Sequence, residues 1–215
     1  MFWNRFFRPK RAAPDLTPDL ERRIRQSFDE AAGDAEHFPD TIDERILHVR
    51  MLLDWIAPAP AGRFLDAGCG KGRFAAVVRK HYPDASVHGL DLSVEMLRYV
   101  QPGIGRCAGS LTALPYRDGA FDAAWATESL EHAVDIERAV AELCRVVKPG
   151  GRVLIIDKNA EQFGRLDTPE WEQWFDRRAL EGLLRRHCHE VESKPLSYWE
   201  DVEPDGLFFV WLAVK

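Results

Sequence analysis

The chain has 215 residues, of which 46% are hydrophobic and 30% charged, a composition that excludes a disordered or fibrous protein. This length suits one hydrophobic core with a terminal extension better than two full domains. The net charge of −6 combines a basic segment at residues 1–11 with an acidic remainder. An acidic body argues against nucleic acid as a partner, because phosphate binding requires clustered lysine and arginine.

The sequence predicts a cytoplasmic protein. No apolar run reaches the roughly 20 residues that span a bilayer, and the first residues do not form a signal peptide. The four cysteines include no CxxC pair, which is typical of reduced thiols. Residues 1–11 mix aromatic side chains with four cations, a composition that also fits peripheral contact with the inner face of a membrane. Nothing in the sequence indicates the oligomeric state.

We divide the chain into a basic aromatic tip at residues 1–15, a helical extension at residues 16–58 and a main domain at residues 59–215. In the extension, Thr17 is a predicted N-cap, and apolar residues recur at helical spacing after it. A second helix is expected to run from Asp40 or Thr41 to the proline cluster that begins at residue 58.

From residue 63 onward, short apolar runs alternate with helical segments, which is the pattern of a parallel sheet built from βαβ units. Strands are expected at residues 62–66, 85–91, 104–109, 121–127, 151–157, 189–195 and 206–214. Helices are expected at residues 71–82, 93–101, 136–147 and 177–187. The last two strands have no helix between them and should pair antiparallel. We therefore predict a doubly wound α/β fold with a seven-stranded, mostly parallel sheet whose last strand is antiparallel.

Residues 64–72 read FLDAGCGKG and lead from a strand through a glycine-rich turn into a helix. Glycine permits positive φ and lets a ligand approach the bare backbone. Arg73 stands where a dinucleotide fingerprint has its third glycine, and no Gly-Lys-Ser/Thr follows, so a dinucleotide site and a Walker loop are both excluded.

This turn resembles the first motif of class I S-adenosylmethionine (SAM) dependent methyltransferases, in which the strand-end acid and the glycines hold the methionine part of SAM. Asp91 ends the next strand, where its carboxylate can accept hydrogen bonds from both ribose hydroxyls. Residues 109–116 resemble the family's adenine-binding segment, with Ser110 where many relatives carry aspartate. The resemblance extends over about residues 60–160 and implies SAM as cofactor. The cofactor-binding residues that it implies are Asp66, Gly68, Cys69, Gly70, Gly72, Asp91, Leu92, Ser110, Leu111 and Thr127.

Residues 128–132 read ESLEH and follow the fourth expected strand. They resemble the Glu-x-x-Glu-His segment of ubiquinone-biosynthesis O-methyltransferases, which is associated with a divalent metal beside a catechol-like acceptor. The resemblance implies either a Mg²⁺ or Zn²⁺ site formed by Glu128, Glu131 and His132, or His132 as the base that deprotonates a hydroxyl. The alternative, which we favour over a metal, is that these side chains brace the SAM site.

Residues 158–176 form an insertion after the fifth expected strand that is longer than an ordinary loop, and such loops are often lids. Aromatic side chains would give this lid an apolar underside that suits an aromatic or lipid-like acceptor. The same aromatics could instead close the core. The predicted lid residues are Phe163, Trp171, Trp174 and Phe175, with Tyr198 and Trp199 facing them.

These patterns together predict an enzyme that transfers a methyl group from SAM by in-line displacement, most readily to oxygen, of a small-molecule acceptor. One alternative is a SAM-binding protein without activity that serves as a partner or regulator. A nucleic-acid methyltransferase is disfavoured because residues 127–130 read TESL where an Asn/Asp-Pro-Pro-Tyr type segment would stand.

Overall fold

The computed structural model describes residues 14–215. The basic tip at residues 1–11, and with it the predicted membrane contact, lies outside these residues. Helix α1 (Pro18–Ala31) begins as expected, because the Thr17 hydroxyl accepts a hydrogen bond from the backbone N–H of Leu20 at 3.1 Å. Among the described helices, none has the length and apolar character needed to cross a bilayer.

Helix α2 (Leu47–Ile56) begins later than the sequence predicted, which corrects the expected start at Asp40 or Thr41. Residues 40–46 are not helical and contain a turn at residues 44–45. The Asp43 carboxylate accepts the backbone N–H of Arg45 at 2.9 Å, and the Asp43 carbonyl accepts that of Ile46 at 3.2 Å. An aspartate that bonds nearby backbone groups in this way competes with helix formation.

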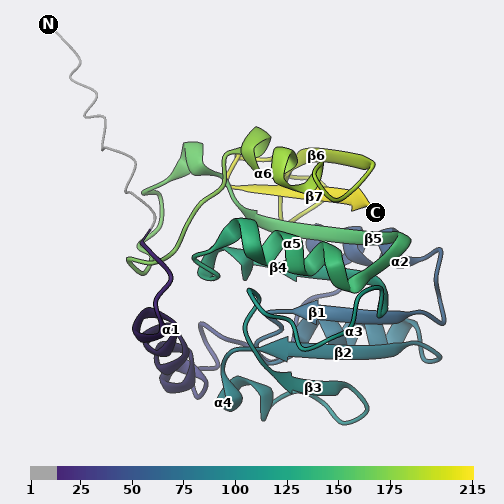
Figure 1. Ribbon diagram of the computed structural model, residues 1–215, viewed down its shortest axis with the longest axis horizontal. Coiled ribbons are helices and arrows are strands. Elements are labelled where there is room, and N and C mark those ends of the chain that lie inside the picture. Colours follow the sequence, from purple (N-terminus) through teal and green to yellow (C-terminus); the bar gives the residue numbers. More distant parts are fainter. Residues whose placement is uncertain (1–13) are drawn as a thin grey trace, which may run out of the picture.

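The described residues form one seven-stranded sheet in the order β3-β2-β1-β4-β5-β7-β6 (Figure 1). The strands are β1 (Arg63–Ala67), β2 (Ser86–Asp91), β3 (Gly105–Ala108), β4 (Phe121–Thr127), β5 (Val147–Lys158), β6 (Glu190–Leu196) and β7 (Phe208–Val214). Strands β1 to β5 pair in parallel, whereas β7 lies antiparallel between β5 and β6. This arrangement confirms the predicted doubly wound α/β fold.

Helices cover both faces of the sheet. Successive residues of a strand point to opposite faces, so Phe64 belongs to the hydrophobic cluster under α2 and α3, and Leu65 to the cluster under α5 and α6. The helices after β1 are α3 (Arg73–His81), α4 (Val94–Leu97), α5 (Ile136–Val146) and α6 (Arg177–Leu184), with 3-10 turns η1 (Leu130–His132) and η2 (Ala160–Gln162). Helix α4 is shorter than expected and is capped by Ser93, whose hydroxyl accepts the N–H of Met96.

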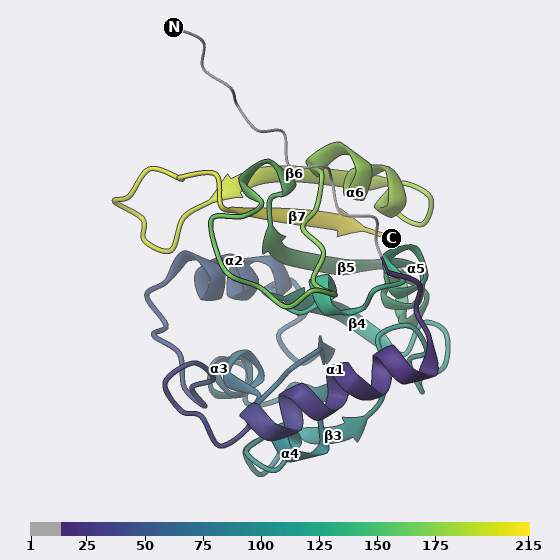
Figure 2. The same ribbon diagram turned by 90° about the vertical axis from the view of Figure 1, so that its left-hand side faces the viewer.

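Helix α1 does not pack on a face of the sheet. It lies across the edge of the sheet formed by the carboxyl ends of the parallel strands. Figure 2 is viewed from this side, with α1 in front. Its buried side chains Leu20 and Ile24 form a small separate cluster with Val134 and Trp171. Asp29 fixes the helix to the segment that joins β2 and α4, because its carboxylate accepts the Ser93 hydroxyl at 2.6 Å. The N-terminal helix is therefore placed over the edge at which α/β proteins bind ligands.

Candidate active site

A cavity of about 450 Å³ lies between the carboxyl ends of the parallel strands and helix α1. The loops after β1, β2, β3 and β4 form one side of this cavity, and Ile24 and Phe28 of α1 line the other. The sequence placed the closing element at residues 158–176, whereas α1 provides much of the cover. The cavity is large enough for a cofactor and a small acceptor to lie side by side.

The glycine-rich turn has two glycines with distinct roles. Gly68 has a φ of +76°, and a Cβ there would lie 2.5 Å from Cβ of Ser129, whose hydroxyl donates to the Ala67 carbonyl at 2.9 Å. Gly70 has a φ of +52°, but a Cβ there would meet nothing within 4 Å. Gly68 therefore lets the turn pack against the loop after β4, while Gly70 borders open space in the cavity.

Asp66 and Gly72, which the sequence predicted as cofactor-binding residues, are not among the residues that line the cavity. The buried Asp66 carboxylate accepts the backbone N–H of Ala75 at 3.2 Å and so ties the end of β1 to α3. Burial raises the pKa of Asp66 to about 7. Gly72 begins α3 with a φ of +79°. Both residues therefore contribute to the conformation of the turn and its connection to α3.

Asp91 lies at the end of β2 and lines the cavity. Its carboxylate accepts the backbone N–H of Gly70 at 2.7 Å and that of Ser93 at 2.8 Å. Burial raises the pKa of this carboxyl group. Each carboxylate oxygen has further lone pairs, so Asp91 can still accept hydrogen bonds from a ribose diol.

The other predicted cofactor residues come together around the same cavity. Ser110 and Leu111 follow β3, and the Ser110 hydroxyl lies 2.9 Å from that of Thr112. The lining includes Gly68, Cys69, Gly70, Asp91, Leu92, Ser110, Leu111 and Thr127. A bare backbone at Gly70, a carboxylate on β2 and an apolar side chain after β3 fit the amino-acid, ribose and adenine parts of SAM.

A buried charged cluster stands beside this lining. The Lys158 ammonium at the end of β5 donates to Glu131 and lies 3.3 Å from Oε1 of Glu172, and all three side chains are at most 11% exposed. Asp157 accepts the backbone N–H of Glu131 at 3.2 Å, and the Trp174 indole donates to Glu172 at 2.7 Å. Of these residues, Glu131, Lys158 and Glu172 line the cavity.

Burial is the main cause of the shifted pKa values of Glu131, Asp157 and His132 in this cluster. Burial and the neighbouring Asp157 raise the pKa of Glu131, and burial raises the pKa of Asp157 to about 6. Burial, together with the Lys158 cation, lowers the pKa of His132 to about 3. An imidazole with so low a pKa is a weak base at neutral pH, so the structure argues against His132 as the general base.

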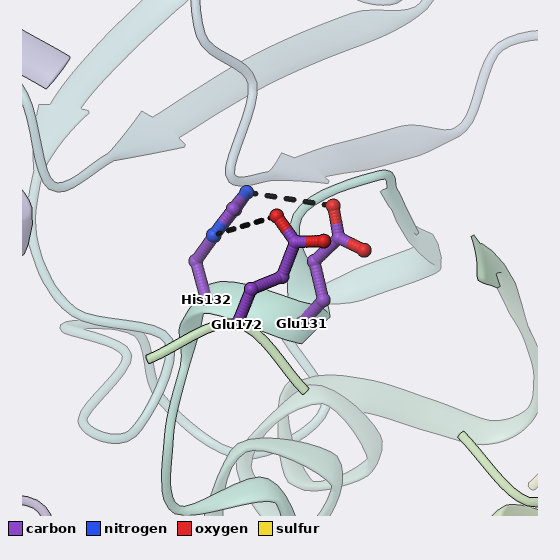
Figure 3. Close-up of side chains that lie close together, drawn as sticks. All are labelled: Glu131, His132 and Glu172. Carbon is purple, nitrogen blue, oxygen red and sulfur yellow. Dashed lines mark ion pairs between the residues drawn. The ribbon is translucent and has the colours of Figure 1, made fainter. Parts of the chain in front are cut away.

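The predicted metal set of Glu128, Glu131 and His132 is not brought together. Glu128 lies 3.6 Å from Arg73 instead, and Glu172 takes its place beside the other two, as Figure 3 shows. The ligand atoms of Glu131, His132 and Glu172 lie within 4.8 Å of one another. The Lys158 ammonium already pairs with Glu131 and lies 3.3 Å from Glu172, and it would repel a second cation placed between them, so these residues do not fit a divalent metal.

The predicted lid aromatics do not share one surface. Trp171 lines the cavity, but Trp174 packs edge-on against Phe163 with ring centroids 5.5 Å apart. The Phe175 side chain lies in the main core. Its backbone N–H donates to the Lys158 carbonyl, and this bond holds the end of the segment against β5. Within residues 158–176, the prediction of a cavity-facing aromatic therefore holds for Trp171 alone.

Neither Tyr198 nor Trp199 is among the residues that line the cavity, although the sequence predicted that both face the lid. Tyr198 stacks on His48 at 4.5 Å between ring centroids, and Trp199 lies 5.9 Å from the guanidinium of Arg45. Sequence reasoning missed Lys158 and Glu172 as members of the site. Both lie in the segment assigned to the lid, and no local pattern marks them as partners of Glu131.

Comparisons with known proteins agree with this geometry. The methyltransferase domain family matches residues 65–155. A demethylmenaquinone methyltransferase from Renibacterium salmoninarum is 30% identical and covers 87% of this chain and 77% of that protein. A 2-phytyl-1,4-naphtoquinone methyltransferase from Nostoc sp. is 29% identical, with 91% and 90% covered. A malonyl-[acyl-carrier protein] O-methyltransferase from Herminiimonas arsenicoxydans is 31% identical, with 76% and 62% covered.

Solved structures show the same fold. The [4+2]-cyclase SpnF superposes with a TM-score of 0.76 at 19% identity, covering 95% of this chain and 99% of that one. The 1,6-didemethyltoxoflavin-N1-methyltransferase of Burkholderia thailandensis, solved with bound S-adenosylhomocysteine, gives a TM-score of 0.70 at 22% identity, covering 94% and 92%. The chain belongs to the class I SAM-dependent methyltransferase family and uses SAM as its cofactor.

Proposed function

We propose that this methyltransferase transfers the methyl group of SAM to a hydroxyl oxygen of a neutral aromatic or lipid-like small molecule. The observation that carries the proposal is the two-sided cavity. Ile24, Phe28 and Trp171 offer apolar surface, and the buried cluster around Lys158 offers polar groups. An acceptor with an apolar body and one polar group would contact both sides.

The relatives support this class of acceptor. Two of them are named for quinone substrates, which have an apolar ring system and oxygen substituents. Another is named for a malonyl group, which carries a carboxylate. The charge of the cavity argues against a carboxylate here. Its acidic lining residues are Glu21, Asp91, Glu128, Glu131 and Glu172, against the basic Lys71, Arg73 and Lys158.

The chain's contribution to the reaction is chiefly to position the acceptor and exclude water. SAM supplies an electrophilic methyl group on a sulfonium, and the residues that would hold it are Gly70, Asp91 and Leu111. The acceptor oxygen forms an O–C bond to this methyl carbon as the C–S bond breaks, and the hydroxyl proton then leaves. Glu131 lines the cavity, and its carboxylate can receive this proton by way of the neutral His132 ring, whose Nε2 lies 3.4 Å from Oε1 of Glu131. Positioning of this kind can lower a barrier by about 7 to 11 kcal/mol.

The test is a comparison of acceptor classes of similar size. S-adenosylhomocysteine release would be measured with wild-type protein, SAM and each of a hydroxynaphthalene, a naphthoic acid and an aminonaphthalene. The proposal predicts release with the hydroxynaphthalene and little with the other two. Preference for the acid or the amine would contradict it. Relatives named as enzymes do not favour the alternative of a SAM-binding regulator without activity.

A further inference from the structure

We propose that Trp171, Lys158 and His132 form a subsite that recognises the acceptor's hydroxyl group and so favours a hydroxylated ring over the same ring without the hydroxyl. This inference rests on the proposed function, because it assigns residues to the acceptor that this function requires. The three residues come from three separate segments and all line the same cavity. Each supplies a different part of the hydrogen bonding that a hydroxyl needs.

Trp171 supplies a hydrogen-bond donor that has no partner within the described structure. The residue is 8% exposed, and its indole Nε1 is buried without an acceptor. A buried N–H left without an acceptor carries a desolvation cost that a bound acceptor oxygen would remove. Because Trp171 lines the cavity, an oxygen atom of a bound acceptor is the natural partner for this N–H.

Lys158 supplies a second donor and a positive charge. An ammonium has three N–H donors; one donates to Glu131, and Glu172 is an ion-pair partner 3.3 Å away, so these carboxylates engage at most two of them. Although burial opposes it, the charge of Glu131 raises the pKa of Lys158, so the side chain remains a cation. The third N–H can bond an oxygen in the cavity, and the positive charge would stabilise the negative charge that develops on it.

His132 supplies the acceptor. Its Nε2 lies 3.4 Å from Oε1 of Glu131, and its buried Nδ1 lies 4.0 Å from Oε2 of Glu172, too far for a hydrogen bond. The imidazole is neutral, so a proton on Nε2 facing Glu131 leaves Nδ1 as a bare acceptor. A hydroxyl can donate to Nδ1 and accept from Trp171 or Lys158, whereas a keto oxygen can only accept.

The test compares two probes that share a shape and differ in the hydroxyl. Binding of 1-naphthol and of 1-methylnaphthalene would be measured by calorimetry on the full-length protein saturated with S-adenosylhomocysteine. Trp171→Phe keeps an aromatic ring and removes the unpartnered N–H. We expect it to weaken 1-naphthol about 5-fold, to leave 1-methylnaphthalene unchanged and to preserve the stability of the unliganded protein.

Trp211→Phe is the matched control. Trp211 lies on β7, is fully buried and does not line the cavity, and its indole donates to the Arg177 carbonyl at 3.1 Å. The same ring change there should lower stability and leave the affinity for 1-naphthol unchanged. Equal losses for both probes in Trp171→Phe, or no loss for either, would overturn the subsite.

Lys158→Met tests the charged member. We expect about a 30-fold loss of affinity for 1-naphthol, with partial rescue in Lys158→Arg. Because Lys158→Met leaves Glu131 and Glu172 without their cation, it can unfold the protein, and the Trp171→Phe result then decides. If Mg²⁺ or Zn²⁺ strengthens 1-naphthol binding in the wild type, the role given to the ammonium is overturned.

If the wild type binds S-adenosylhomocysteine but methylates no hydroxylated acceptor, the proposed function fails. If it methylates one and the variants bind 1-naphthol as the wild type does, only the subsite fails.

Discussion

The Asp91 carboxylate accepts a hydrogen bond from the backbone N–H of Gly70 at 2.7 Å. This bond joins the end of β2 to the glycine-rich turn after β1, so the residues that we propose to hold the ribose and the methionine part of SAM are fixed relative to each other. Charge-assisted bonds of this kind are among the stronger hydrogen bonds in proteins.

Asp91→Ala is therefore expected to weaken SAM binding by about 1.5 to 3 kcal/mol, or about 10- to 150-fold. Asp91→Asn keeps one acceptor oxygen and should lose less. Calorimetric titration with S-adenosylhomocysteine measures both changes. Wild-type affinity in Asp91→Ala would show that this carboxylate does not hold the ribose.

Alanine substitutions at Gly68 and Gly70 should separate folding of the turn from cofactor binding. Alanine at Gly68 would place its Cβ 2.5 Å from Cβ of Ser129, so both thermal stability and SAM binding should fall. Alanine at Gly70 meets no protein atom within 4 Å and should cost only about 1 to 2 kcal/mol of backbone strain. It should nevertheless abolish SAM binding, because its methyl group enters the space that the cofactor needs. Tight SAM binding by Gly70→Ala would contradict this assignment.

The buried Asp66 predicts a pH dependence of stability. Its folded pKa of about 7 lies above the unfolded value of 3.8, so between these values the folded state binds more protons than the unfolded state. Stability therefore falls as pH rises through this window, by at most about 4 kcal/mol. Asp66→Asn removes the titration and keeps an acceptor for the N–H of Ala75, so its advantage over the wild type should grow from pH 5 to pH 8.

Asp122→Asn is the control for this pH dependence. Although burial opposes it, the Arg63 N–H and the Lys148 ammonium lower the pKa of Asp122. Its stabilising contribution is present above pH 3.8 and is lost only as the pH falls, so Asp122→Asn should cost stability evenly from pH 5 to pH 8. Denaturant unfolding without ligand gives both trends. A flat difference for Asp66→Asn would mean that Asp66 is ionised in the folded protein.

The position of α1 over the cavity predicts a role in retaining ligands. Ile24 is 2% exposed beneath the helix, so Ile24→Asp buries a charge and should undock α1. We expect faster proteolysis near residue 24 and weaker acceptor binding. Arg25→Asp introduces the same residue on the exposed side of α1 and should change neither. Unchanged proteolysis and acceptor binding in Ile24→Asp would show that α1 is not needed as a cover.

The sequence was most informative where the signal is local. Alternating strands and helices predicted the sheet, and the glycine spacing with Asp91 predicted residues that line the cavity, because each of these signals lies within a short stretch of the chain. The cover could not be predicted in the same way. The apolar face of α1 was evident, but which surface it packs against depends on contacts with Val134 and Trp171, more than a hundred residues away.

The acceptor side shows the same limit. The segment ESLEH drew attention to Glu128, but the conformation of the loop directs Glu128 to Arg73 and brings Glu131 to Lys158 and Glu172. The Lys158 ammonium of β5 therefore lies beside Glu131, one of the residues predicted to bind a metal. Such a replacement depends on tertiary packing, and neither residue type nor spacing within the segment could reveal it.

The most direct test of the account is a single-turnover reaction with SAM labelled in its methyl group and 1,4-naphthalenediol as the acceptor, kept reduced. We expect NMR to find the label on one of the two oxygens, and we expect the rate to fall in Asp91→Ala through weaker SAM binding. A label on a ring carbon, or no transfer by a protein that binds SAM, would contradict the proposal that this cavity brings the methyl group to a hydroxyl oxygen.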